Sequence, residues 1–376
     1  MPVPDLPETL VPHAPVARRA PSLALRLAGS ARFRAFCARV PGLRWLAQRE
    51  GAALFDLMQG FVQSQVLSAL VELRILHRLA EAPASVPALA ARLEVPAERL
   101  RVLLQAGAAL KLLTRGPGET YALAPRGAAF LSVPGLQALV AHHRVLYADL
   151  SDPAAFFRGA TDPALARFWP YVFGAGQAED PATAATYSRL MSDSQSVVAE
   201  ETLRHLDLGA SRHLMDVGGG TGTFLRAVHD RWPALRLTLF DLPAVLAAAQ
   251  APPGTTLHPG SFRDGPLPRG ADTISLVRVL YDHSDATVAA LLAAVAQALP
   301  PGGRLIISEP MGGGAQPDPQ TDVYFAVYTL AMQTGRARSP AEIGALLAGA
   351  GFEGISLKSR DFSFVTCVLT AEAPKA

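Results

Sequence analysis

HLMDVGGGTG, residues 213–222, is the stretch of sequence that decides the fold. It opens with a short apolar run typical of a buried strand, and a helix is predicted to begin at Thr223. A strand, a glycine turn and a helix in this order make the nucleotide-binding corner of a βαβ unit. Glycines let the backbone approach a ligand where any Cβ would obstruct it. We therefore predict a Rossmann-like α/β domain over residues 209–376.

The residues around the glycine turn narrow the class of ligand. A dinucleotide fingerprint would require glycine at position 223, where Thr223 stands, and the phosphate-loop pattern GxxxxGK[ST] is absent. An acid, Asp216, precedes the glycines, and a second acid, Asp241, closes the next predicted strand, 235–240. The second acid is placed for a ribose diol, and the first suits a ligand with a cationic amino group. S-adenosylmethionine (SAM) has both groups, so we predict SAM as the cofactor and S-adenosylhomocysteine (SAH) as its product.

Later segments complete the pattern of a mostly parallel sheet. Strands are predicted over 272–280 and 304–308, and the final pair, 354–358 and 364–369, is predicted to supply an additional antiparallel strand. The two cysteines lie far apart, at Cys37 and Cys367, and no Cys/His cluster occurs, so neither a disulfide framework nor a metal site is predicted.

The N-terminal half of the chain is predicted to be mostly helical. Residues 51–80 are apolar on nearly every side of a helix, which predicts burial in a core or against another subunit. Helices over 86–93 and 96–110, followed by a hairpin over 114–121, form a winged-helix pattern. A groove-reading helix needs polar and basic side chains along its exposed face. The second helix is apolar from Val102 onward, so we predict that it is buried and that the protein binds no nucleic acid.

These patterns divide the chain into four predicted parts: an extension over 1–50, a winged-helix-like domain over 51–134, a helical linker over 135–208, and the SAM-binding domain over 209–376. The family resemblance given below implies dimerisation for the second part and a substrate pocket for the third. The extension has eight arginines and no acid between Thr9 and Arg49, interleaved with apolar residues. One interpretation is contact with an anionic membrane surface; the other is a solvated helix docked on the core. No stretch is long enough to span a bilayer, and a cytoplasmic protein, peripheral at the inner membrane under the first interpretation, is expected.

The chain resembles the plant-type O-methyltransferases, the group that includes acetylserotonin methyltransferase and its bacterial relatives, in the motifs DVGGGTG, FDLP, RVLYDH, LPPGGRLIISEPM and GAGF. The resemblance covers residues from about 52 to the end. It implies a seven-stranded sheet that binds SAM, with an all-α, winged-helix N-terminal domain that forms an intertwined homodimer.

A narrower resemblance points to the bacterial carotenoid O-methyltransferases of purple phototrophs. It rests on the segments FDLMQGFVQSQVL, AHHRVLYADLSDP, ARFWPY, YSRLMSDSQSVVAEE, SLVRVLYDH and DVYFAVYTLAMQTGRARS. Those enzymes methylate the tertiary 1-hydroxyl of acyclic carotenoids such as hydroxyneurosporene and demethylspheroidene, which implies a carotenoid substrate here. The alternatives are O-methylation of an aromatic polyketide or other phenol, C-methylation of a bacteriochlorophyll precursor, or a winged-helix regulator that senses SAM.

The plant-type family uses the histidine of an HDW motif as general base, and that position here is Tyr281. His283 occupies the tryptophan position, and Glu309 falls where a family glutamate orients the base. The family's second glutamate corresponds to Ala337 and is missing. Tyr281 and His283 are therefore the predicted proton acceptors or relays, with Glu309 as the orienting residue.

The resemblance also implies binding residues for the two substrates. The predicted cofactor contacts are Asp216, Gly218, Gly220, Asp241, Leu242, Gln195, Phe262 and Ser261, the last of which replaces a family acid at the adenine. The predicted acceptor contacts are Met191, Tyr324, Tyr328, Met332, His142 and His143.

Overall fold

The computed structural model describes residues 26–27, 29–168, 195–358 and 366–375. The predicted acceptor contact Met191 lies outside these residues, as do Arg18 and Arg19 of the extension. The chain forms two compact units, Met1–Val66 and Leu67–Ala376, which are described separately. Among the described residues, no helix is both long and apolar enough to cross a membrane.

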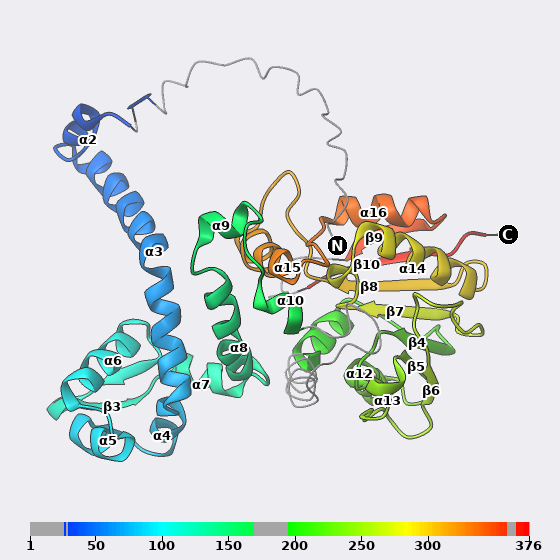
Figure 1. The fold of residues 1–376 in the computed structure, drawn as a ribbon, viewed down its shortest axis with the longest axis horizontal. Coiled ribbons are helices and arrows are strands. Elements are labelled where there is room, and N and C mark those ends of the chain that lie inside the picture. The colour runs from blue at the N-terminus through cyan, green and yellow to red at the C-terminus, as the bar shows by residue number, and fades with distance from the viewer. Residues whose placement is uncertain (1–25, 28, 169–194, 359–365, 376) are drawn as a thin grey trace, which may run out of the picture. The chain divides into compact units, whose positions relative to one another are not determined.

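A seven-stranded sheet organises the C-terminal part of the second unit (Figure 1). Its strand order is β6-β5-β4-β7-β8-β10-β9, in which β10 runs antiparallel to both of its neighbours and the other pairs are parallel. This confirms the predicted α/β fold class. The strands are β4 (His213–Val217), β5 (Arg236–Asp241), β6 (Thr256–Pro259), β7 (Thr273–Val277), β8 (Arg304–Glu309), β9 (Glu353–Lys358) and β10 (Cys367–Glu372).

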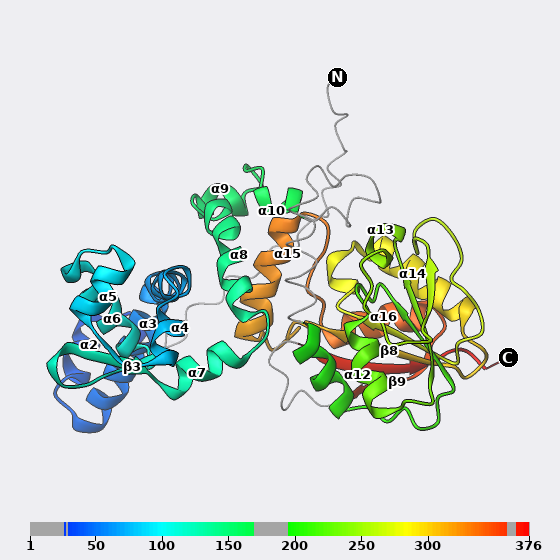
Figure 2. The ribbon, with the colours of Figure 1, turned by 90° about the horizontal axis from the view of Figure 1, so that it is seen from below.

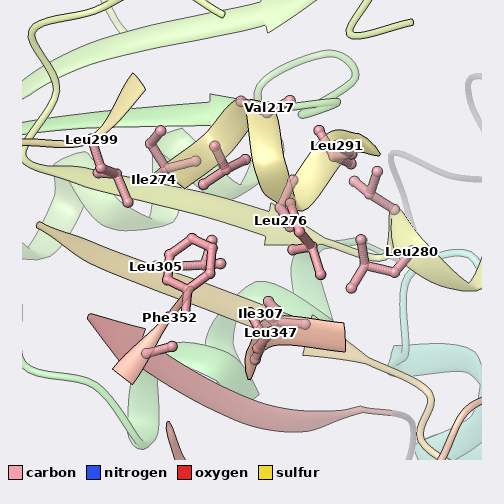
Figure 3. Packing of buried hydrophobic residues seen from close by; sticks show 14 of the residues in the cluster. Val217, Ile274, Leu276, Leu280, Leu291, Leu299, Leu305, Ile307, Leu347 and Phe352 are labelled. Carbon is pink, nitrogen blue, oxygen red and sulfur yellow. The ribbon is translucent and has the colours of Figure 1, made fainter. Parts of the chain in front are cut away.

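Helices cover both faces of this sheet because its central strands are apolar on both sides. On one face α14 (Asp285–Ala298) and α16 (Pro340–Gly349) enclose a core with Ile274, Leu305 and Ile307 (Figure 3). On the other face α12 (Thr223–Arg231), α13 (Pro243–Leu246) and a helix over 195–204 pack on Leu214 and Leu239. Figure 2 shows the same sheet and helices in a view turned by 90°.

Two predicted strands have different bounds in the structure. The strand predicted over 272–280 ends at Val277, because Arg278 takes a left-handed φ of 58° and the chain turns into the 3-10 segment η3 (Leu280–Asp282). The strand predicted over 364–369 is β10, which runs on to Glu372; residues 364 and 365 lie outside the described residues.

The winged-helix pattern is confirmed in the segment before the sheet domain. α5 (Val86–Leu93) and α6 (Ala97–Ala109) precede a hairpin of β2 (Leu113–Arg115) and β3 (Thr120–Leu123), which also pairs with β1 (Ala84–Ser85). Within the single chain, the prediction that the second helix is buried holds for only one of its faces. Only one face of α6, with Leu100 and Leu104, is buried, and Val102 is 70% exposed. Pro96 is the N-cap of α6 and not its first residue.

The remaining helices of the second unit include two that carry predicted acceptor contacts, α8 and α15. α8 bears His142 and His143, and α15 follows the π-helical segment η4. The bounds are α4 (Ile75–Glu81), η1 (Pro117–Glu119), α7 (Pro125–Ser132), α8 (Leu136–Asp149), α9 (Pro153–Phe157), α10 (Ala164–Phe168), η4 (Pro319–Phe325) and α15 (Ala326–Met332).

The first unit contains α2 (Ala31–Cys37) and most of α3 (Pro41–Glu72). Residues 51–62 of α3 were predicted to be buried, yet large apolar side chains there are exposed in the single chain. They are Leu54, Phe55, Leu57, Met58, Phe61 and Val62, with exposed fractions of 47–80%. Exposed apolar side chains on this scale mark an interaction surface, so the prediction of burial within the chain's own core is wrong and burial against a second subunit remains.

Candidate active site

The candidate active site lies at the carboxyl ends of β4, β5, β7 and β8. Strand order reverses between β4 and β7: β5 and β6 lie on one side of this pair and β8 on the other. Ligands of open α/β sheets bind at such a switch point, outside the carboxyl ends of the strands. Asp216, Asp241, Tyr281 and Glu309 all belong to these strand ends or to the turns that follow them.

The glycine turn after β4 is shaped for a close approach. Gly218, Gly220 and Gly222 have φ values of 70°, 60° and 85°, which L side chains rarely adopt. Gly219 is required for space, since a Cβ there would lie 2.2 Å from Asp216 Oδ2. At the switch point, a ligand would therefore meet the backbone of this turn without obstruction by side chains at Gly218, Gly219 and Gly220.

Asp216 is fully buried beneath this turn. Ser275 Oγ donates a hydrogen bond to its Oδ1 at 2.6 Å, whereas Oδ2 has no hydrogen-bond partner within the described part of the chain. Burial raises the pKa of Asp216 to about 7, and the nearby charge of Asp241 adds to the rise while the Ser275 bond opposes it. A buried carboxylate oxygen without a partner is costly unless a ligand group pairs with it.

Asp241 is the last residue of β5 and faces the same turn. Its Oδ2 accepts the Gly220 N–H at 2.8 Å, and its Oδ1 accepts the Leu242 N–H at 2.7 Å. Burial raises the pKa of Asp241 to about 6, against the lowering effect of these two bonds. Asp241 thus ties the second strand to the glycine turn, and each of its oxygens has lone-pair capacity for another donor.

The turn after β7 carries the predicted catalytic position, Tyr281. Glu309, at the end of β8, is buried and binds the backbone of this turn. Its Oε1 accepts the N–H groups of Val279 and Leu280, both at 2.7 Å, and its Oε2 accepts the N–H of Tyr281 at 3.4 Å. Burial raises the pKa of Glu309 to about 7. Glu309 therefore holds the backbone of the turn, a different contact from the side-chain orientation that the resemblance implied.

Tyr281, which is buried, and Asp282, which is half-buried, form a polar pair in η3. The Tyr281 hydroxyl accepts a hydrogen bond from Arg278 at 3.4 Å, and a hydrogen bond with Tyr281 stabilises the ionised Asp282 carboxylate. Burial raises the pKa of both groups, for Asp282 well above its ordinary value, and the charge of Arg278 opposes both rises. Among the described residues Asp282 Oδ1 has no hydrogen-bond partner. Asp282 therefore brings a carboxyl oxygen with free lone pairs to this turn.

His283 is held in a way that disfavours proton uptake. Its Nδ1 lies 3.0 Å from Arg263 Nη2, and a guanidinium can only donate, so Nδ1 is the acceptor and Nε2 carries the proton. Burial, followed by the charges of Arg263 and Arg338, lowers the pKa of His283 to about 4. The imidazole ring packs edge-to-face against Phe262, with 5.3 Å between the ring centres. This geometry favours a packing and orienting role over the predicted role as a base.

Two histidine–tyrosine pairs join α8 to the η4–α15 segment. His142 Nε2 lies 2.8 Å from the Tyr328 hydroxyl, and His143 Nε2 lies 2.8 Å from the Tyr324 hydroxyl. Burial lowers the pKa of His142, to about 4, and that of His143. Phe325 contacts both Tyr324 and Tyr281, at ring distances of 5.0 and 6.4 Å. Four of the predicted acceptor contacts, His142, His143, Tyr324 and Tyr328, thus form one aromatic cluster with Phe325, next to the turn that carries Tyr281.

The other predicted residues lie in more ordinary settings. Gln195 Nε2 donates to the carbonyl of Val277 at 3.4 Å, which places it at the end of β7. Ser261 Oγ accepts the Arg263 N–H at 3.2 Å within its own turn. Met332 is 1% exposed in an apolar cluster with Leu146 and Phe156. The binding roles of these residues remain predictions.

Family comparisons agree with this geometry. A family model described as an O-methyltransferase domain matches residues 147–353, and one described as an O-methyltransferase dimerisation domain matches residues 55–133. The second match contains the winged-helix segment, and the first contains the switch point together with Tyr324, Phe325 and Tyr328 of the aromatic cluster. The chain belongs to the O-methyltransferase family. The predicted enzyme class and the resemblance to this family are confirmed.

Individual relatives of this methyltransferase cover most of its length. Demethylspheroidene O-methyltransferase of Cereibacter sphaeroides is 58% identical over 94% of this chain and 96% of its own, and that of Rhodobacter capsulatus is 56% identical over 92% and 88%. Acetylserotonin O-methyltransferase of Mus musculus is 31% identical over 83% of this chain and 86% of its own. The crystal structure of human N-acetylserotonin methyltransferase in complex with SAM is 25% identical, with a TM-score of 0.74 over 87% of this chain and 98% of that one.

Sequence reasoning missed four residues of the site: Arg278, Asp282, Arg263 and Arg338. Arg278 could have been found from the sequence, because it is a charged residue within the otherwise apolar run SLVRVL, and a charged residue in a buried strand requires a partner. Asp282 stands between the two residues that were predicted. Nothing in the local sequence pointed to Arg263 or Arg338, which reach the site from separate loops.

Proposed function

We propose that this methyltransferase transfers a methyl group from SAM to the tertiary hydroxyl of an acyclic hydroxycarotenoid of the demethylspheroidene type. The identity of 58% with a demethylspheroidene O-methyltransferase, sustained over 94% of the chain, is the observation that carries this proposal. The aromatic cluster supports it, because rings and apolar groups suit an extended hydrocarbon. The products are a methoxycarotenoid and SAH.

SAM fits the residues at the switch point. The unpartnered Oδ2 of Asp216 suits a cationic group, Asp241 suits a ribose diol, and the turn through Gly218 and Gly220 leaves room for a ligand against the backbone. Bound SAM supplies a methyl group on a sulfonium, which is a strong electrophile. No metal is proposed, and none of the described residues forms a group of three or more metal-ligating side chains.

The chain's own residues then have to position a hydroxyl and receive its proton. A tertiary alcohol is about as weak an acid as water, with a pKa of ~16, so neither Tyr281 nor His283 would ionise it in advance. We propose that proton loss accompanies methyl transfer and that Asp282 accepts the proton while Tyr281 orients the carboxylate. Water exclusion by the surrounding rings strengthens these contacts.

Incubation with labelled SAM tests the substrate assignment. The purified protein is given 1-hydroxycarotenoids, simple phenols or tetrapyrroles, each in the same detergent. We expect label in the methoxycarotenoid and, relative to it, at most about 1% of the rate with phenols, since a pocket shaped for one acceptor places another poorly. Label in a phenol or a tetrapyrrole but in no carotenoid would establish one of the alternative functions instead.

We propose that the enzyme is a homodimer built through α3 and the winged-helix segment. The dimerisation family model begins at residue 55, where the exposed apolar residues of α3 lie. Burying such side chains in a second subunit stabilises a dimer by about 25 cal/mol per Å² of apolar surface. Light scattering after size exclusion measures the mass, and a monomer at micromolar concentration would contradict the proposal.

We propose that the arginine-rich extension contacts an anionic membrane surface, where a carotenoid substrate would dissolve. Both family models begin after residue 50, so they leave this segment unexplained. Trp45 and Phe36 are exposed by 62% and 55%, and the Arg49 guanidinium lies 5.7 Å from the Trp45 ring centre. Flotation with anionic vesicles should recover the protein, and with zwitterionic vesicles should not. Equal recovery from both, or binding to DNA instead, would remove this part of the proposal.

A further inference from the structure

The turn that contains η3 is held by two buried charged groups, Glu309 and Arg338. Glu309 accepts the backbone N–H groups at the start of the turn, as described above. Arg338, which is 2% exposed, donates to the carbonyls at its two ends: Nη1 to Leu280 at 2.9 Å and Nη2 to His283 at 2.7 Å. The backbone of the turn is therefore fixed by a carboxylate at the N–H groups of residues 279–281 and by a guanidinium at the carbonyls of Leu280 and His283.

Arg338 is itself fixed by its neighbours. Its Nε donates to Asp285 Oδ1 at 2.8 Å, and Nη1 also reaches the Arg336 carbonyl at 3.3 Å. Asp285 opens α14, immediately after the N-cap Ser284. A planar guanidinium with its donors used in a set geometry is a rigid support, which a lysine ammonium is not.

The loop that carries Arg338 touches the turn directly. A Cβ on Gly335 would lie 1.9 Å from the carbonyl oxygen of Tyr281. This close approach places the loop against the backbone of Tyr281 and Asp282. The family's second glutamate would have stood at Ala337, one residue before Arg338. The support from this loop thus reaches the turn through backbone carbonyls and not through a carboxylate.

We propose that Arg338 is a positioning residue for methyl transfer, which holds the Leu280–His283 turn so that Tyr281 and Asp282 face the acceptor hydroxyl. The inference rests on the proposed function for the chemistry of Asp282. The physical reason is that a reacting group displaced by about 1 Å loses up to about a hundredfold in rate. Arg338 touches no reacting atom and acts only through the turn.

Arg336 offers a matched control. It forms ion pairs with Asp285 and Glu342 at 3.1 and 2.7 Å, but the structure gives its side chain no contact with the turn. It is also exposed, with a side chain 46% accessible, so its ion pairs contribute little. Replacing Arg336 by lysine therefore perturbs the same network without touching the turn.

The experiment compares Arg338→Lys with Arg336→Lys in the full-length enzyme. We expect Arg338→Lys to lower kcat about 10- to 100-fold while the Kd of SAM stays within about twofold, because the lost contacts act on the turn and not on the glycine loop. Arg336→Lys should keep both within about twofold. If Arg338→Lys fails to fold, Asp285→Ala, which removes one partner of Arg338, should give a smaller loss of kcat in the same direction.

Amide hydrogen exchange gives a second readout that does not require the acceptor to be known. Protection of the amides of residues 279–283 should fall at least about tenfold in Arg338→Lys and stay unchanged in Arg336→Lys. Unchanged protection in Arg338→Lys, or a kcat equal to that of Arg336→Lys, would overturn the inference. If the wild-type enzyme methylates no carotenoid, the proposed function fails, and the exchange result alone decides whether Arg338 holds the turn.

Discussion

Asparagine in place of Asp282 is expected to lower kcat about 10²- to 10⁴-fold, the usual contribution of a general base. The amide keeps the size of the carboxyl group but cannot accept the hydroxyl proton. Because Asp282 lies in η3, after β7, and does not belong to the glycine turn after β4, the Kd of SAM should change by no more than about twofold. Single-turnover measurements with a saturating carotenoid give kcat, and calorimetry gives the Kd.

The neighbouring positions serve as controls for this result. Tyr281→Phe removes the hydrogen bond to Asp282 but not the acceptor, so its loss should be smaller, about tenfold. His283→Gln should cost less still, since Arg263 already occupies the acceptor nitrogen of the ring. A variant series in which His283→Gln is the most damaging would show that the histidine, and not Asp282, takes the proton.

Alanine in place of Asp241 is expected to weaken SAM binding about a hundredfold. Each charge-assisted hydrogen bond contributes about 1.5 kcal/mol or more, and a ribose diol offers two hydroxyls to this carboxylate. The variant also frees the N–H groups of Gly220 and Leu242, which loosens the turn. Calorimetry with SAM and with SAH measures the loss, which should be similar for both because they share the ribose.

Two comparisons make this result specific. Asp264→Ala removes an exposed acid that follows the next strand, β6, and should leave the Kd within about twofold.

The affinity of the wild-type protein for SAM should also fall as the pH is lowered from 8 to 6. With pKa values of about 7 for Asp216 and about 6 for Asp241, Asp216 loses most of its charge over this range and Asp241 about half, and a neutral acid attracts a cation less. An affinity for SAM that is independent of pH, or intact in Asp241→Ala, would contradict the assigned cofactor site.

The sequence predicted the features that depend on neighbouring residues. The strand before Gly218, the helix from Thr223 and the helix Val86–Leu93 follow from local periodicity and glycine chemistry, and the structure confirms them. The end of β7 did not follow, because the turn at Arg278 depends on Glu309, which binds the backbone from another strand. The lowered pKa of His283 did not follow either, because it depends in part on the charges of Arg263 and Arg338, which are distant in sequence. Tertiary contacts of this kind have no local signature.

The place of β10 in the sheet bears on how the chain folds. β10 lies between β8 and β9, yet both of these strands precede it along the chain. During synthesis on the ribosome, β8 and β9 therefore emerge before the strand that must separate them, and they have to keep their edges apart until it arrives. Val368 and Leu369, 1% and 2% exposed, then complete both layers of the core. The sheet is completed by a strand inserted at an interior position, so a chaperone that shields unpaired strand edges would have its task at this step.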